Sequence, residues 1–84
     1  MTKPAKLYLN LLANSRQTIS FRDFEALLAA FGFELARITG SHHHYRHPAI
    51  AGTLTVTPRG KDANGYQVRQ FCAMVEKQGL KGNG

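Results

Sequence analysis

The sequence predicts a small α+β domain in which a three-stranded antiparallel sheet carries helices packed on one face. Three observations predict it. Two segments repeat apolar residues at helical spacing, the chain between them alternates apolar and polar residues, and the connections between the alternating runs are short. The 84 residues leave room for one such domain. The expected order is helix, three strands and helix, after a short extra helix.

We expect three parts along the chain: an N-terminal helical extension at 1–18, the domain at 19–80 and a flexible polar tail at 81–84. Pro4 suits the first turn of a helix, where a missing N–H costs nothing, and leucines follow at helical spacing as far as Leu12. This first helix is short and would be marginal on its own.

Two longer helices are expected at about 20–31 and 65–78. Ser20 can cap the first helix, and Asn64 can cap the second as part of a capping box completed by Gln67. The apolar stripes of the helices should pack against the sheet. The core predicted in this way consists of Phe24, Leu28, Phe31, Leu35, Leu54, Val56, Val68 and Phe71.

Strands are expected at about 33–39, 43–47 and 53–57, because residues there alternate and include β-branched or aromatic types. The segment 48–52 is rich in Pro, Ala and Gly and is expected to be a loop. The polar segment 58–65 is expected to be a second loop. Short connections of this kind favour an antiparallel meander.

Alternation also predicts which side chains share a face. In the first strand, Leu35 and Arg37 should point the same way. In the second strand, the core face needs apolar bulk and Tyr45 is the only residue that supplies it. Tyr45 should therefore face the helices, together with His43 and His47. The solvent face of this strand should then carry His42, His44 and Arg46.

Charge and histidine content indicate the kind of function. The net charge is +6, and all four histidines fall within residues 40–48. Imidazole can both give and take a proton near neutrality. A histidine cluster on a basic chain favours chemistry on a polyanion, or binding to one, and nucleic acid is the foremost example. Arg59 and Lys61 place two further cations on a backbone that could follow phosphates.

Other features of the sequence indicate the cellular compartment. Cys72 is the only cysteine, which excludes an internal disulfide and a multi-thiolate zinc site and fits a reducing compartment. No apolar run approaches the roughly 20 residues of a membrane span. The first residues lack a secretory apolar region. We therefore expect a cytoplasmic protein with no membrane association.

These residues also allow other roles. His42 and His44 could begin a zinc site, but no Cys, Asp or Glu lies nearby in sequence to complete one. The histidines could also simply form a polar edge strand. Ser41 lacks a partner acid for nucleophilic hydrolysis and is better explained as a turn residue. Cys72 lies on an apolar stripe, which favours a core position over a nucleophile.

Four motifs of the chain belong together: FGFEL at 31–35, GSHH at 40–43, RHP at 46–48 and YQVRQ at 66–70. Together they resemble the HicA family of bacterial toxins, and the last is similar to the C-terminal helix of one branch of that family. The resemblance covers about Ile19 to Leu80. His44 stands where the family usually has an aliphatic residue.

The resemblance implies a fold like a double-stranded-RNA-binding domain and a metal-independent mRNA endonuclease held inactive by a HicB antitoxin. It implies no cofactor. The family's catalytic histidine follows a Gly-Ser or Gly-Gly turn, and the matching residue is His42. We expect His42 to act by general acid–base catalysis on a ribose 2′-OH. The expected RNA contacts are Ser41, His44, Arg46, Arg59 and Lys61.

Two further functions stay open from the sequence. The chain could be a non-catalytic RNA-binding module, in which His42 contacts a phosphate or a 2′-OH. It could also be a structural partner of an antitoxin-like protein that has lost catalysis. Cleavage of RNA in EDTA, compared with His42→Ala, separates the first function from these two.

Overall fold

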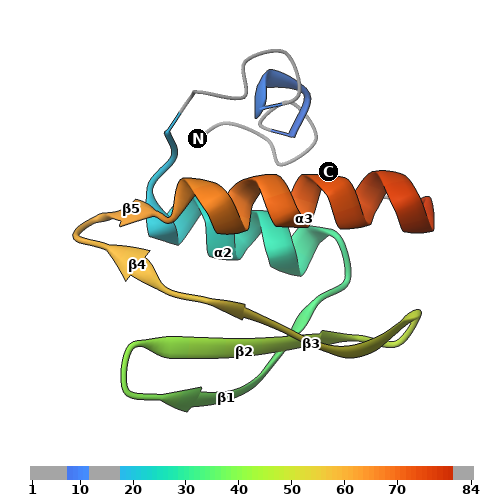
Figure 1. Ribbon diagram of the computed structural model, residues 1–84, viewed down its shortest axis with the longest axis horizontal. Helices are drawn as coiled ribbons and strands as arrows, with labels where there is room; N and C mark the ends of the chain where they lie inside the picture. Colours follow the sequence, from blue (N-terminus) through green and yellow to red (C-terminus); the bar gives the residue numbers. More distant parts are fainter. Residues whose placement is uncertain (1–7, 12–17, 81–84) are drawn as a thin grey trace.

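The computed structural model describes residues 8–11 and 18–80 and confirms the expected fold class (Figure 1). A three-stranded antiparallel sheet, in the order β1-β2-β3, carries helices α2 and α3 on one face. Residues 8–11 are helical, and Leu11 is buried against the domain. Pro4, Leu12 and the expected tail at 81–84 lie outside the described residues.

Helix α2 spans Phe21–Ala30 and begins as the capping signal predicted. The Oγ of Ser20 accepts a hydrogen bond from the backbone N–H of Asp23 at 3.0 Å, which satisfies one of the free amides of the first turn. After the helix, Gly32 adopts a φ of +90°, a backbone conformation that L side chains rarely adopt. The chain can therefore turn sharply toward the sheet.

Helix α3 spans Gly65–Gln78, and its N-cap is Asn64, as expected. The predicted capping-box role of Gln67 is wrong. Its side-chain oxygen accepts the backbone N–H of Thr57 at 2.7 Å, and its Nε2 donates to the Oγ1 of Thr57 at 3.1 Å. Gln67 therefore connects the start of α3 to the end of the sheet, because Thr57 lies within hydrogen-bonding distance of its side chain.

The strands are β1 (Glu34–Thr39), β2 (His42–His47) and β3 (Ile50–Val56), followed by a small hairpin of β4 (Pro58–Arg59) and β5 (Asp62–Ala63). Both segments expected to be loops therefore contain strand. Strand β3 begins at Ile50 rather than near residue 53, because a register shift after Arg46 lets His47 pair with Ile50. The two residues skipped by this register shift are Ala51 and Gly52, and Gly52 has a φ of +84°.

A bulge in β1 changes the predicted faces. Leu35 pairs with Tyr45, but Arg37 pairs with His44, so Ala36 is an extra residue. Directly opposed residues of an antiparallel pair share a face. Leu35 therefore shares the face of Tyr45, and Arg37 shares the opposite face with His44. The prediction that Leu35 and Arg37 point the same way is wrong because strict alternation cannot anticipate the inserted residue.

The core lies between the sheet and the two helices. Phe71 and Phe24 are fully buried, and the ring of Phe71 contacts those of Phe24, Phe31 and Phe33 edge-on. Seven of the eight predicted core residues are buried, and the exception is Leu35, which is 45% exposed. Strand β1 is one of the two edge strands of the sheet, and part of its inner face is left uncovered. Cys72, expected on the buried stripe of α3, is half-buried.

Candidate active site on the open face of the sheet

The central strand β2 presents two chemically different faces, as alternation predicted. Tyr45 is 5% exposed and lies on the helix side, where its cross-strand neighbour Leu54 is also buried. His43 and His47 share that side and contact α2 and the residue that follows it. The remaining residues of β2, His42, His44 and Arg46, therefore point away from the core.

Glu25 of α2 holds β2 in place from the helix side. One of its oxygens, Oε2, accepts hydrogen bonds from the Nδ1–H of His43 at 2.9 Å and from the hydroxyl of Tyr45 at 2.6 Å. Burial and the neighbouring carboxylate both raise the pKa of Tyr45, because each disfavours a phenolate. Apart from the inward position of the two strand residues, no sequence pattern indicated this network.

His47 has both ring nitrogens occupied. The backbone N–H of Ala49 donates to its Nδ1 at 3.0 Å, so that nitrogen carries no proton, and Nε2–H donates to the carbonyl of Phe31 at 3.0 Å. These two bonds connect the end of α2 to the β2–β3 turn. His47 is therefore a structural residue, as its predicted helix-facing position implied.

The opposite surface of the sheet is left uncovered by the described helices (Figure 1), and we call it the open face. The strand register builds it in cross-strand rows. Arg37, His44 and Thr55 form one row, and Thr39 and His42 form the next. A further row contains Glu34, Arg46 and Thr53. The open face is thus a polar surface in which two imidazoles lie among arginines and threonine hydroxyls.

His42 and His44 are neighbours on this face. Their rings are nearly parallel, with an interplanar angle of 16° and centroids 6.4 Å apart. His42 is exposed, directly after the turn that contains Gly40 and Ser41. His44 is partly buried, and its Nδ1 lies 2.9 Å from the Oγ1 of Thr55. Both rings can therefore meet a ligand placed on the open face.

Arg37 is a candidate site residue that the sequence analysis did not assign to the site. Its charge was noticeable, but alternation assigned it to the wrong face, and the bulge at Ala36 brings it beside His44. Arg46 lies on the open face as predicted. Its Nε is 3.9 Å from the Oε2 of Glu34, and both side chains are mostly exposed, so this ion pair is weak and salt-sensitive.

The other predicted RNA contacts lie at one end of the molecule. Ser41 is exposed in the β1–β2 turn, and Arg59 and Lys61 are exposed in the β4–β5 hairpin. Figure 1 shows this turn and this hairpin at the same end. The hairpin is attached to the helix layer, because the carbonyl of Lys61 accepts the backbone N–H of Phe21 at 2.9 Å. Among the described residues, no side-chain hydrogen bond or ion pair joins the hairpin cations to the open face.

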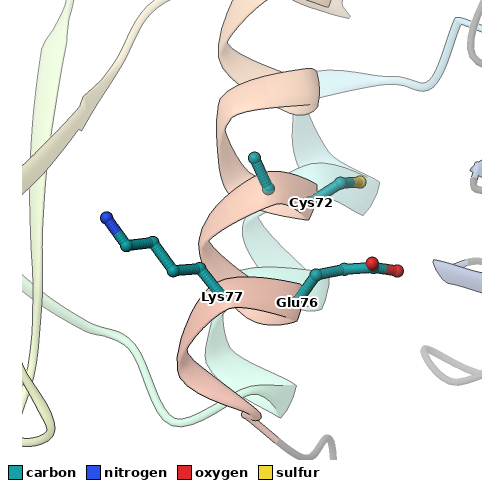
Figure 2. A pocket seen from close by; sticks show the side chains of 4 residues that line it. Cys72, Glu76 and Lys77 are labelled. Carbon is teal, nitrogen blue, oxygen red and sulfur yellow. The ribbon is translucent and has the colours of Figure 1, made fainter.

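A hollow on the described surface lies elsewhere, along α3, at Cys72, Ala73, Glu76 and Lys77 (Figure 2). Figure 2 shows Cys72 and Glu76 pointing to the same side of the helix. Burial, together with this carboxylate, raises the pKa of the Cys72 thiol. A thiol that resists ionisation is a poor nucleophile.

Two further properties concern residues 8–11 and 18–80. No three His, Cys, Asp or Glu side chains within these ranges gather closely enough to hold a metal ion. None of the helices in this part of the chain combines the length and the apolar character needed to span a membrane.

Comparison with protein families gives a match over residues 21–80, to a family described as "HicA toxin of bacterial toxin-antitoxin". The match covers more than half of the chain. The chain belongs to the HicA toxin family. No curated protein and no solved structure matches the HicA-family chain significantly. Membership makes the chain a toxin of a toxin–antitoxin system, and its antiparallel sheet with helices fits the double-stranded-RNA-binding-domain-like fold expected from the resemblance.

Proposed function

We propose that this HicA toxin is a metal-independent endoribonuclease that cleaves mRNA, with His42 as its general base. The observation that carries the proposal is the exposed imidazole of His42 on the open face, with Arg37 and Arg46 on the same face. Proton acceptor and cations together are what cleavage of a phosphodiester by its own 2′-OH requires. The family assignment supports a toxin that acts on RNA.

In this mechanism, neutral His42 takes the proton of a ribose 2′-OH. The 2′-oxygen attacks the adjacent phosphorus, and the 5′-oxygen leaves, so the products are a 2′,3′-cyclic phosphate and a 5′-hydroxyl. Dependence on the 2′-OH makes the enzyme selective for RNA over DNA. One well-placed proton-transfer group supplies about 10²–10⁴-fold in rate, so the enzyme is slow. Slow cleavage suffices for a toxin, since one cut inactivates a message.

The cations supply binding and charge stabilisation. Arg37 and Arg46 can contact phosphates on the open face, and Arg59 and Lys61 can extend the contact at the adjoining end. Affinity should fall steeply with salt, because each phosphate contact releases counterions. Replacing Arg59 and Lys61 together by Ala should weaken binding without a change in sequence preference. Affinity that stays flat between low and high salt would argue against such a surface.

A HicB-like antitoxin is proposed as the protein partner, and the cytoplasm as the compartment. The partner follows from the family, whose toxins are paired with an antitoxin. A partner that silences the toxin would need to cover the open face or prevent RNA from reaching it. Co-expression of such an antitoxin should abolish the growth arrest that the toxin causes.

The test is cleavage of RNA by the purified chain in EDTA, alongside His42→Ala. We expect cleavage by the wild-type chain, a 2′,3′-cyclic phosphate or its hydrolysis product, and loss of both cleavage and growth arrest in His42→Ala. His47→Ala is the matched control, because this histidine serves the fold and should affect stability more than rate. Full activity of His42→Ala would overturn the mechanism, as would activity lost in EDTA and restored by zinc. Binding without cleavage would favour the non-catalytic RNA-binding module.

A further inference from the structure

We propose that His44 is a second catalytic residue, the general acid that protonates the leaving 5′-oxygen. This proposal rests on the endoribonuclease function proposed above, in which His42 is the base. It assigns the two proton transfers of the reaction to two neighbouring histidines on β2. The single-histidine mechanism has no protein group for the second transfer.

The first support is the spacing of the two rings. Alternate residues of a strand are about 6.6 Å apart along its axis and share a face, and here the two imidazole centroids are 6.4 Å apart. In an in-line displacement the attacking and leaving oxygens are separated by roughly 3.5 Å, and a hydrogen bond to each adds about 3 Å. The two imidazole nitrogens that exchange protons with these oxygens can therefore lie at most roughly 9.5 Å apart, and closer when the hydrogen bonds are inclined to the line of attack. The centroid spacing of His42 and His44 is compatible with this range.

The second support is the orientation of the His44 ring. Its Nδ1 lies 2.9 Å from the hydroxyl oxygen of Thr55, a cross-strand neighbour in the register. With Nδ1–H donating to that hydroxyl, the ring is held in place and Nε2 is left for a ligand. A protonated imidazole keeps this hydrogen bond and still carries a transferable proton on Nε2. The Thr55 hydroxyl can thus accept the Nδ1–H hydrogen bond when His44 is protonated and acts as a general acid.

The other two histidines do not offer this arrangement. His47 uses both of its ring nitrogens in hydrogen bonds to the backbone. His43 donates Nδ1–H to Glu25 on the helix side, and its ring lies edge-on to that of Phe21. Of the four histidines, only His42 and His44 have rings available on the open face.

The resulting step is balanced. The 2′-OH gives its proton to His42 as the O2′–P bond forms, while the P–O5′ bond breaks and the departing oxygen takes the Nε2 proton of His44. His42 ends protonated and His44 neutral, and exchange with water restores both. No oxidant, metal or other co-reactant is needed.

The test uses a leaving group that needs no proton. In an RNA whose cleaved linkage carries sulfur in place of the bridging 5′-oxygen, the sulfur departs as a thiolate. We expect His44→Ala to lose about 10²-fold or more on the oxygen linkage but to cleave the sulfur linkage at nearly the wild-type rate. His42→Ala should be slow on both linkages, because the base is still required.

Two variants guard against misinterpretation. His44→Gln offers an amide that can bond Thr55 but cannot act as an acid, and it should behave like His44→Ala if the role is chemical. Thr55→Val keeps the side-chain shape without the hydroxyl and should lose part of the rate on the oxygen linkage only. Circular dichroism and melting of each variant establish that it is folded.

The outcomes separate this proposal from the function on which it rests. If His44→Ala and His44→Gln are equally slow on both linkages, or fully active on both, His44 is not the general acid. In either case the nuclease with His42 as base stands. If the wild-type chain cleaves neither linkage, the proposed function itself fails and this inference fails with it.

Discussion

Replacing Glu25 tests the hydrogen-bond network that fixes β2 and so positions the histidines of the open face. In Glu25→Ala, the Nδ1–H of His43 and the hydroxyl of Tyr45 both lose their acceptor. Tyr45 is 5% exposed, so its hydroxyl has little access to replacement water. The variant should therefore be destabilised because two hydrogen-bond donors are left without an acceptor, and not merely because one surface charge is lost.

The magnitude follows from the burial. A buried donor left without a partner costs about 1–3 kcal/mol. His43 and Glu25 keep side-chain exposures of 20% and 29%, so water can recover part of this cost. We expect a total loss of about 2–4 kcal/mol in the free energy of unfolding. In a domain of this size, that lowers the melting temperature by roughly 10–25 °C.

The assay is urea or thermal unfolding followed by circular dichroism. Glu34→Ala is the matched control, because Glu34 is a carboxylate on the open face with 72% of its side chain exposed, and it should change stability by less than about 0.5 kcal/mol. Tyr45→Phe should lower the free energy of unfolding less in the Glu25→Ala background than in the wild type, because the hydroxyl that it removes has already lost its acceptor. Strictly additive costs would refute the network.

The same network predicts a pH effect. The pKa of Tyr45 is raised by burial and then by Glu25, so the folded state holds a proton that the unfolded chain releases above about pH 10. The Tyr45 contribution to stability is therefore present below pH 10 and is lost as the pH rises through the folded-state value. Spectroscopic titration should show a lower pKa for this phenol in a folded Glu25→Gln variant. An unchanged pKa would mean that burial alone sets it.

Three further predictions concern the core and the thiol. Phe71→Ala should lower the free energy of unfolding by about 3–5 kcal/mol. Leu35→Ala should lower it by less than about 1 kcal/mol, because that side chain is 45% exposed. Similar losses in the two variants would contradict the described core. Gly32→Ala should cost about 2–4 kcal/mol, from its φ of +90° and from a new Cβ 2.9 Å from the Nε2 of His47. Adding His47→Ala should recover the part of this stability loss that comes from the clash with the His47 ring. If the double mutant recovers no stability, the loss has another cause. Cys72 should react with iodoacetamide near neutral pH more slowly than a free cysteine, and an equal rate would contradict its raised pKa.

Local sequence signals determined the parts of the fold that depend on near neighbours. Ser20 capped α2 as expected, because the cap and its partner amide are three residues apart. The alternation of β2 correctly divided its histidines between the two faces, because Tyr45 was the only residue able to supply core bulk. The prediction that His42 and His44 share the face directed away from the helices followed from the same argument.

Tertiary structure decided what depends on partners distant in sequence. The bulge at Ala36 exists only in the pairing of β1 with β2, and it moved Arg37 to the open face. Leu35 is exposed because β1 lies at the edge of the sheet, a position that no local pattern reveals. The hydrogen bonds of Glu25 to β2 likewise require the packing of a helix on a strand. The periodicity of a sequence describes one segment at a time. The register between strands, and the parts of the sheet that the helices cover, are set only when the segments assemble.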